Sequence, residues 1–361
     1  MTASLYIANA NAVIDDDAQI VKLRLSCLEN NQEITNCFTT SNALMDWISN
    51  TRTTNAGNLL VNVGPGSFGF FRCSNFNNLS VKGAGPTNTF ISGLHASNCF
   101  DLNVQDVTIT NTFPSPVYWS GDGSSTWTNV HLDGSIYGWT ETNCASTTSR
   151  PVHRWFSSKI NSSGKVIYLA DCSENWFYGS ELVLTGAPWS GFKNGFMVRA
   201  SNGNETTSFP EIHIYGSVVR VILDAGVSFN AMRAFEVGTN GEVHIHGSGI
   251  DVIGNNLDNT VTAMYAHNGG KIHASASSFV MKTGSQGVKQ RLSNNNSTIM
   301  APYTWEPQIL NTTNFVSIDG QDMATEVICN GSNCSPHNMV YMSSCTTNGP
   351  WYDSFTKQCR N

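Results

Sequence analysis

The chain has 361 residues, of which 12% are charged, and its formal net charge is −7. Soluble domains usually carry about 25% charged residues, so Asn, Ser, Thr and Gly take the place of charge here. The acidic balance excludes nucleic acid as the main partner, because phosphate contacts require clustered Lys and Arg. The longest apolar runs, such as 59–63, are far shorter than the roughly 20 residues that cross a bilayer, which excludes a transmembrane segment.

The first 40 residues are predicted to form an N-terminal extension. Residues 1–6 have neither a basic region nor an apolar core, so no secretory signal is predicted there. Residues 4–14 are apolar and small, and could pair with the edge of a neighbouring subunit. The acidic run 15–17 makes calcium the one cofactor to consider, although a solvated turn is the favoured interpretation.

A helix is predicted over residues 41–49. Apolar residues lie at 44, 45, 47 and 48, and the capping residues Thr40 and Ser41 precede them. Because this helix stands directly before the repeats, we expect it to cover the open end of their core.

From about residue 70 to 284 one pattern returns: an apolar strand, an Asn or Gly turn, an alternating strand, a Gly-Ser turn and a third strand. The clearest copies are centred on His244 and His273, which are 29 residues apart. Taking 80, 103, 131, 154, 176, 213, 244 and 273 as the central positions gives intervals of 22 to 37 residues. Such spacing without helical periodicity predicts a right-handed single-stranded parallel β-helix over 41–290, in an all-β chain. Asn residues at turn positions are predicted to stabilise the stacking: Asn75, Asn98, Asn202, Asn240 and Asn268.

Residues 291–361 are predicted to form a C-terminal cap and a Cys-rich tail. The chain has ten Cys, of which four lie after residue 328. No C-x2-C spacing occurs, so disulfides are favoured over zinc, and an extracellular or cell-surface location follows.

Residues 40–93 resemble the start of the pectin-lyase-like superfamily, which includes pectinesterases, pectate lyases and polygalacturonases. The matching segments are the helix 43–48, the strand with Pro-Gly at 59–68, the N-L-x-V-x-G-x-G segment at 78–85 and the T-x-I-x-G segment at 89–93. The resemblance implies the parallel β-helix and a substrate groove along its stacked strands. It implies no particular activity, because the catalytic motifs of those families are absent; residues 149–152 only partly match the pectinesterase Gly-Arg-Pro-Trp box.

Alternation along the strands predicts three exposed columns that stack from coil to coil. The sequence places five of the nine His, together with acidic and aromatic residues, in one such stripe. For proton abstraction next to a uronate carboxylate, the predicted base is His213 or His131. The predicted charge-neutralising cation is Arg154, and the predicted acid is Tyr178 or Tyr215. The predicted substrate-binding residues are Trp176, whose flat face suits a sugar ring, and Glu174, Glu211, Glu242, His244, His246 and Asp133.

No metal site is predicted. Glu242, His244 and His246 have chelating side chains, but residues two apart on a strand stand about 7 Å apart and rarely converge. A solvated sheet face held by cross-strand pairs is the competing interpretation of the whole stripe.

The sequence therefore predicts an exported β-helix protein that engages polysaccharide along a His/aromatic face, as a lyase, an epimerase or a glycoside hydrolase if it is an enzyme. The alternative is a non-catalytic structural or adhesive subunit of a filament or surface appendage, which self-associates. An ice-binding or crystal-binding face is disfavoured, because Thr-x-Thr does not recur in every coil.

Overall fold

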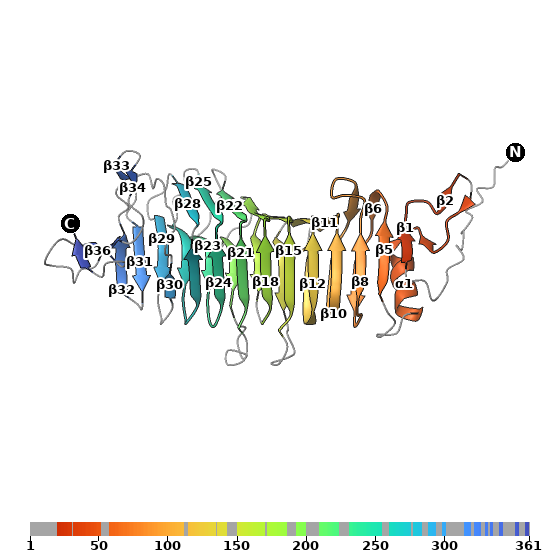
Figure 1. The fold of residues 1–361 in the computed structure, drawn as a ribbon, viewed down its shortest axis with the longest axis horizontal. Coiled ribbons are helices and arrows are strands. Elements are labelled where there is room, and N and C mark those ends of the chain that lie inside the picture. The colour runs from red at the N-terminus through yellow and green to blue at the C-terminus, as the bar shows by residue number, and fades with distance from the viewer. Residues whose placement is uncertain are drawn as a thin grey trace.

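The computed structural model describes residues 20–30, 32–51, 58–111, 115–134, 136–142, 150–169, 172–185, 193–199, 209–223, 231–254, 260–275, 277–283, 288–293 and 298–300, and short strands between 314 and 360. Three strands form each coil, and each strand pairs in parallel with its counterpart in the next coil. The three resulting faces run along an elongated molecule, with α1 (Ser41–Thr51) at one end (Figure 1). This is the right-handed parallel β-helix that the repeats and the resemblance predicted.

The three faces are named here by the order of their strands within a coil. Face 1 comprises β1 (Ile20–Leu23), β5 (Leu59–Val63), β8 (Leu79–Lys82), the second halves of β10 (Leu94–Gln105) and β12 (Val117–Thr128), β15 (Val152–Phe156), β18 (Glu174–Tyr178), β21 (Glu211–Tyr215), β24 (Glu242–His246), β27 (Lys271–Ser275) and β30 (Thr298–Met300). Face 2 comprises β6 (Gly66–Phe68), β9 (Thr89–Ile91), β11 (Thr108–Asn111), β13 (His131–Gly134), β16 (Lys159–Ser162), β19 (Glu181–Thr185), β22 (Val218–Leu223), β25 (Gly249–Gly254) and β28 (Ser278–Thr283). Face 3 comprises β7 (Phe71–Ser74), the first halves of β10 and β12, β14 (Tyr137–Thr142), β17 (Lys165–Leu169), β20 (Lys193–Val198), β23 (Ala231–Val237), β26 (Thr260–Ala266) and β29 (Val288–Ser293).

The predicted turn asparagines lie at the corner between face 3 and face 1. Asn75, Asn98, Asn240 and Asn268 all have φ between 50° and 56°, the left-handed conformation that Asn tolerates. Asn98 donates through Nδ2 to Asn75 Oδ1 at 3.1 Å and accepts from the backbone N of Asp122 at 3.0 Å. Neighbouring coils are therefore joined by amide side chains, as predicted; Asn202 lies outside the described residues.

In four coils the corner between face 1 and face 2 is one left-handed residue followed by a buried serine, and a fifth buried serine, Ser277, continues the series. Each serine Oγ accepts from a backbone N of the coil before it, at 3.0–3.3 Å, in the series Ser158, Ser180, Ser217, Ser248 and Ser277. The repeated Gly-Ser of the sequence thus provides a positive φ and a hydrogen bond between coils, with no charge to repel its copies.

Gly216 gives a direct test of this corner. Its φ is 54°, and a Cβ added there would meet no atom within 4 Å, so only backbone strain opposes substitution. Because Asn129 holds the same corner at φ 52°, we expect Gly216→Asn to change the free energy of unfolding by less than about 0.5 kcal/mol. Gly216→Val is expected to cost about 1–2 kcal/mol, since a β-branched residue is strained in this conformation. Urea unfolding measures both, and equal costs would contradict the assignment.

Inward residues of the three faces fill one continuous core. This core contains four fully buried tryptophans, Trp119, Trp127, Trp139 and Trp155. The rings of Trp127 and Trp155 stack at 4.7 Å between neighbouring coils of face 1. The stacked aromatic groups continue the core along the axis of the molecule.

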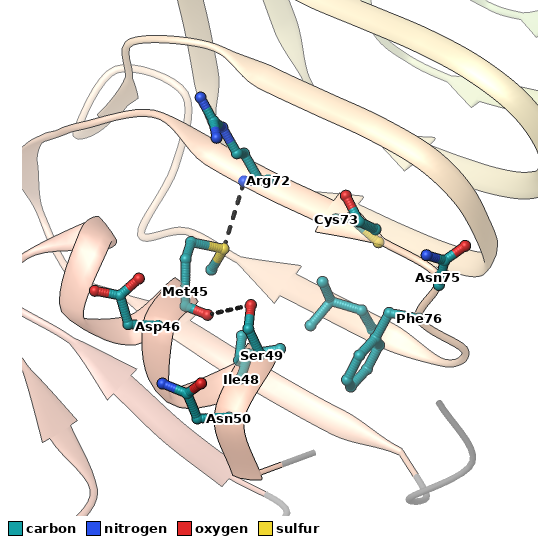
Figure 2. Close-up of a pocket in the computed structure, with 11 residues that line it drawn as sticks. Met45, Asp46, Ile48, Ser49, Asn50, Arg72, Cys73, Asn75 and Phe76 are labelled. Carbon is teal, nitrogen blue, oxygen red and sulfur yellow. Dashed lines mark hydrogen bonds between the residues drawn. The ribbon is translucent and has the colours of Figure 1, made fainter. Parts of the chain in front are cut away.

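At the N-terminal end, α1 covers the core as predicted. Thr40 Oγ1 accepts from the backbone N of Ala43 at 3.2 Å, and Leu44 is fully buried. Met45 Sδ accepts from the backbone N of Arg72 on β7 at 3.4 Å, beside a cavity of about 630 Å³ between α1 and β7 (Figure 2). The helix therefore closes the coil by packing against the first strand of face 3.

Disulfides occur as predicted among the described residues. Cys27 bonds to Cys37, and Cys73 on β7 bonds to Cys99 on β10, which ties two neighbouring coils together. Cys172 is also disulfide-bonded. No cysteine with a described side chain is free, which fits an oxidising compartment.

Parallel pairing runs from β1 to β30, a wider span than the predicted unit 41–290. It begins earlier because β1 matches β5 in register, with Ile20 opposite Leu60. β4 (Cys37–Phe38) also pairs in parallel with β1. The remaining strands pair antiparallel: β2 (Leu28–Glu29), β3 (Gln32–Glu33), β31 (Asn314–Ile318), β32 (Gln321–Thr325), β33 (Cys329–Asn330), β34 (Asn333–Cys334), β35 (Met339–Tyr341), β36 (Trp351–Asp353) and β37 (Gln358–Arg360). No helix in the described part of the chain has the length and apolar character needed to span a membrane.

Candidate functional site

The predicted stripe exists on face 1 and is called here the outward stripe. Over β15, β18, β21, β24 and β27 the strands pair without a register shift. Its first column is Val152, Glu174, Glu211, Glu242 and Lys271; its second is Arg154, Trp176, His213, His244 and His273; its third is Phe156, Tyr178, Tyr215, His246 and Ser275. Alternation had placed all of these residues correctly.

Two predicted site residues do not belong to the stripe. His131 and Asp133 lie on β13 of face 2, where they pair with Thr108 and Thr110. The face 1 strand of that coil is the second half of β12, with Thr126 opposite both Asn103 and Arg154. The prediction failed because Asn129 was taken as a strand residue, whereas it has φ 52° and forms the corner between the two faces. The left-handed corner residue that directly follows each face 1 strand from β10 to β24 was the signal that could have fixed this frame.

The rings of the second column form a continuous stack along the molecule. Trp176 stacks on His213 with centroids 3.8 Å apart, His213 on His244 at 4.6 Å, and His244 on His273 at 4.9 Å, with planes within 10° of parallel. In the third column Phe156 stacks on Tyr178 at 5.2 Å, and Tyr178 on Tyr215 at 5.6 Å. The faces of these rings therefore contact one another, and their edges face outward.

His213 covers one ring face of Trp176, and the neighbour of Trp176 in the other adjacent coil is Arg154, which has no ring. The rings of Tyr178 and Tyr215 lie beside Trp176 at 6.2 and 5.8 Å. The contact of Trp176 with a sugar stays a prediction.

Phe156, at the start of the third column, stacks on Tyr178 on one side. Its coil neighbour on the other side is Thr128, which has no ring, and the side chain is 36% exposed. Phe156 thus has an aromatic face that no ring of the described residues covers.

Three glutamates of the first column contact the ring edges of the second column. Glu211 Oε2 lies 3.3 Å from His213 Nε2, and Glu211 Oε1 accepts from Arg150 Nη1 at 2.9 Å. The hydrogen bond with His213 and then that with Arg150 lower the pKa of Glu211 to about 2, although burial opposes this. Glu174 Oε1 accepts from Trp176 Nε1 and lies 3.9 Å from His213 Nε2. Glu211 is therefore ionised throughout the physiological pH range.

His213, the predicted base, is 8% exposed, and its Nε2 faces Glu211 and Glu174. One coil further, Glu242 Oε1 lies 3.1 Å from Nε2 of both His244 and His273. Burial, followed by the neighbouring His213, lowers the pKa of His244. Burial and then the neighbouring Tyr215 raise the pKa of Tyr178, which keeps its hydroxyl protonated. The imidazoles are thus held by carboxylates rather than presented freely to a substrate.

The donor atoms nearest to a metal-binding arrangement are those of Glu174, Glu211 and His213, which lie within 4.8 Å of one another. Arg150 Nη1 is 4.0 Å from Glu174 and 2.9 Å from Glu211, so a cation of the chain already neutralises them. His246 does not join Glu242 and His244, because its Nδ1 contacts Ser275 Oγ at 2.7 Å. The absence of a metal remains a prediction, and residues 15–17 lie outside the described residues.

A second group of charged and aromatic residues lies on face 3, where no site was predicted from the sequence. Lys165 on β17 lies over the rings of Tyr137 and Tyr168, and Arg233 on β23 lies over the ring of Tyr265. Glu236, 7% exposed, pairs with Arg233 at 2.7 Å. The number of residues between a face 2 strand and the next face 3 strand varies from coil to coil. The members of this group therefore do not recur at a fixed sequence distance from the corner residues, and they were not predicted.

Comparison with known proteins gives a fold resemblance only. No protein-family model matches the chain, and no characterised protein matches it in sequence. Among solved structures, YbhC of Escherichia coli is 14% identical over 70% of this chain and 75% of that chain, with a TM-score of 0.47. A pectin methylesterase mutant in complex with a hexasaccharide is 14% identical over 64% and 78%, with a TM-score of 0.44. PemA, a pectin methylesterase from Erwinia chrysanthemi, is 13% identical over 64% and 78%, with a TM-score of 0.40.

Proposed function

We propose that the protein binds an acidic polysaccharide along the outward stripe, with a uronate bound at Arg154 and Phe156. The observation that carries this proposal is the end of the ring stack. Arg154 and Phe156 leave the same side of β15. Arg154 is exposed and makes no ion pair with a described side chain, and one face of Phe156 carries no stacked ring of the described residues. An aromatic face beside an unpaired guanidinium suits a sugar ring that carries a carboxylate.

The rest of the stripe supplies hydrogen-bonding groups for further sugars. The Tyr178 hydroxyl is protonated, and Glu174 and Glu242 carry acceptor oxygens at the edge of the stack. From Arg154 to His273 the stripe spans four coil steps, or about 19 Å at a strand spacing of about 4.8 Å. Because its carboxylates repel a uronate, we expect them to face sugar hydroxyls, while the sugar carboxylate goes to Arg154.

Replacing Arg154 by Gln tests this site. We expect the affinity for polygalacturonate, measured by titration calorimetry, to fall about tenfold or more, the value of a charge-assisted hydrogen bond. The matched control is Arg220→Gln on face 2, an arginine already paired with Glu181 at 2.7 Å, which should bind like the wild type. Fully methyl-esterified polymer should bind weakly to all three proteins. Equal binding of polygalacturonate by wild type and Arg154→Gln would overturn the proposal.

Catalysis on this face stays a further proposal, with His213 as base, Arg154 as charge-neutralising group and Tyr178 or Tyr215 as acid. Its support is that these groups share one face within three coils. Incubating pectin and alginate with the binding-competent protein, and following viscosity and new reducing ends, separates a depolymerase from a binding protein. Hydrolysis and elimination both form new reducing ends, and ultraviolet absorbance from an unsaturated sugar at the new non-reducing ends would indicate elimination.

One observation favours a second candidate, a non-catalytic structural or adhesive subunit. The ring faces and histidine edges of the stripe are largely used in contacts with each other, as in a sheet face that stabilises itself. Light scattering across a concentration series tests self-association. Polymers that disappear when residues 1–20 are removed, in a protein that binds no polygalacturonate, would favour this candidate.

A further inference from the structure

Two asparagines whose side chains the structure describes begin the sequence Asn-x-Ser, the acceptor motif for N-linked glycans. They are Asn78, at the corner before β8, and Asn161, on β16 of face 2. A glycan is bulky and hydrophilic, so its asparagine needs an exposed amide group that no neighbouring strand covers. Six further motifs begin at asparagines whose side chains lie outside the described residues: Asn204, Asn295, Asn296, Asn311, Asn330 and Asn333.

Asn78 presents its amide group at a fixed and exposed corner. Its φ is 60°, its backbone N donates to Phe100 O at 2.9 Å, and its backbone O accepts from Leu59 N at 3.0 Å, so both neighbouring coils hold the turn. The side-chain amide forms no hydrogen bond with any residue that the structure describes. An acceptor nitrogen is therefore held on the outside of the coil by its own backbone.

The hydroxyl group that the motif requires is on the same side. Leu79 is buried in the core, whereas Ser80 lies on the outward side of β8 and is half-buried. Within the described part of the chain, Ser80 Oγ has no hydrogen-bond partner. Both groups of the motif are thus free of contacts that a glycan would have to break.

Asn161 has an equivalent motif in a covered position. Its Nδ2 donates to Asp133 Oδ1 of the preceding coil at 3.3 Å, and its Oδ1 is buried. Val183 of the following coil pairs with it on the other side. A glycan there would break the contact with Asp133 and press on the strands at both sides, so the structure separates two motifs that the sequence does not distinguish.

Two further features favour a glycan at Asn78. Phe100, whose backbone O accepts from Asn78 N, is 42% exposed, and an exposed aromatic ring beside the amide offers apolar surface that the first sugar covers. The disulfide between Cys73 and Cys99 joins the coils of β7 and β10 at the same corner. Disulfides form in oxidising compartments, and the lumen of the endoplasmic reticulum, where N-linked glycans are added, is one of them.

We propose that Asn78 carries an N-linked glycan, transferred from a lipid-linked oligosaccharide diphosphate in the secretory pathway. Asn78 Nδ2 attacks C1 of the first sugar, the bond between nitrogen and C1 forms, and the bond between C1 and the diphosphate oxygen breaks. Nδ2 loses one proton, and the lipid diphosphate leaves. The inference is independent of the proposed function, because β8 lies three coils before β15, which carries Arg154.

The test is site-specific mass spectrometry of the full chain, secreted from a eukaryotic host. We expect the peptide that contains Asn78 to carry a glycan, which a peptide N-glycosidase releases and leaves aspartate at this position. The peptide that contains Asn161 is the matched control within the same molecule and should be unmodified. An unmodified Asn78 in secreted protein with intact disulfides would overturn the proposal, and so would equal glycan occupancy at Asn78 and Asn161.

Variants separate attachment of the glycan from the role of Asn78 in the turn. Asn78→Gln should lose one glycan from the intact mass, and Asn161→Gln should lose none. Because glutamine is strained at a φ of 60°, the decisive variant is Ser80→Ala, which keeps the turn and removes only the hydroxyl group. It should also lose one glycan, and Ser80→Thr should retain it. A glycan that persists at Asn78 in Ser80→Ala would contradict recognition of this motif.

Discussion

Replacing His153 by alanine is expected to destabilise the protein by about 3–5 kcal/mol, because it leaves a buried carboxyl group without its partner and opens a cavity in the core. His153 is fully buried on the inward side of β15, and its Nε2 lies 3.5 Å from Glu141 Oε1 on β14, which is 1% exposed. Neither oxygen of Glu141 forms a hydrogen bond with a described residue, so the contact with His153 is its closest polar contact there. Its ring also packs against Trp119 and Trp139, at 4.5 and 5.0 Å, and these contacts are lost as well.

Urea unfolding followed by tryptophan fluorescence measures this effect, since Trp119 and Trp139 pack against His153. His131→Ala is the matched control: His131 is a half-buried histidine of face 2, and its removal should cost less than about 1 kcal/mol. The double variant Glu141→Leu/His153→Leu should recover most of the loss, because it replaces a buried pair by apolar groups. Equal stability of His153→Ala and His131→Ala would show that the pair does not hold the core.

The fold was predictable because its repeated features are local in sequence. A Gly-Ser or Asn at a corner can be read from a few residues, and Ser217 and Asn98 form the hydrogen bonds between coils that such residues suggest. The same repeats explain the low charge of the chain. Neighbouring coils place equivalent residues about 4.8 Å apart, where Asn and Ser can bond to their copies and like charges would repel.

The candidate site was only partly predictable, because it depends on side-chain orientation. Alternation placed His213 beside Trp176 and His244, but it gave no information on whether rings face solvent or each other; packing at 3.8 and 4.6 Å decides this. His131 was misplaced because two frames, ending at Thr128 or at Asp133, both preserve alternation. Lys165 went unnoticed, since its partners Tyr137 and Tyr168 lie on strands whose spacing follows variable connections.

Acid is expected to weaken the outward stripe through Glu211, with a loss of up to about 3 kcal/mol at 1.36 kcal/mol per pKa unit. The pKa of Glu211 is lowered from 4.5 to about 2, first by the hydrogen bond with His213 and then by Arg150. Between these two values the unfolded chain binds a proton that the folded protein does not. The stabilisation is therefore fully present above about pH 4.5 and is lost as the pH falls toward 2.

The measurement is the thermal midpoint as a function of pH from 6 to 2, for wild type and for Glu211→Gln. The wild-type midpoint should fall more steeply below pH 4.5, because the variant has no carboxyl group to protonate at this position. At pH 6 the variant should be the less stable protein, since Arg150 and His213 lose their shared acceptor. The difference between the two proteins should shrink as the wild-type Glu211 becomes protonated. A constant difference from pH 6 to 2 would show that Glu211 titrates alike in the folded and unfolded chains, and that Arg150 and His213 do not hold its charge.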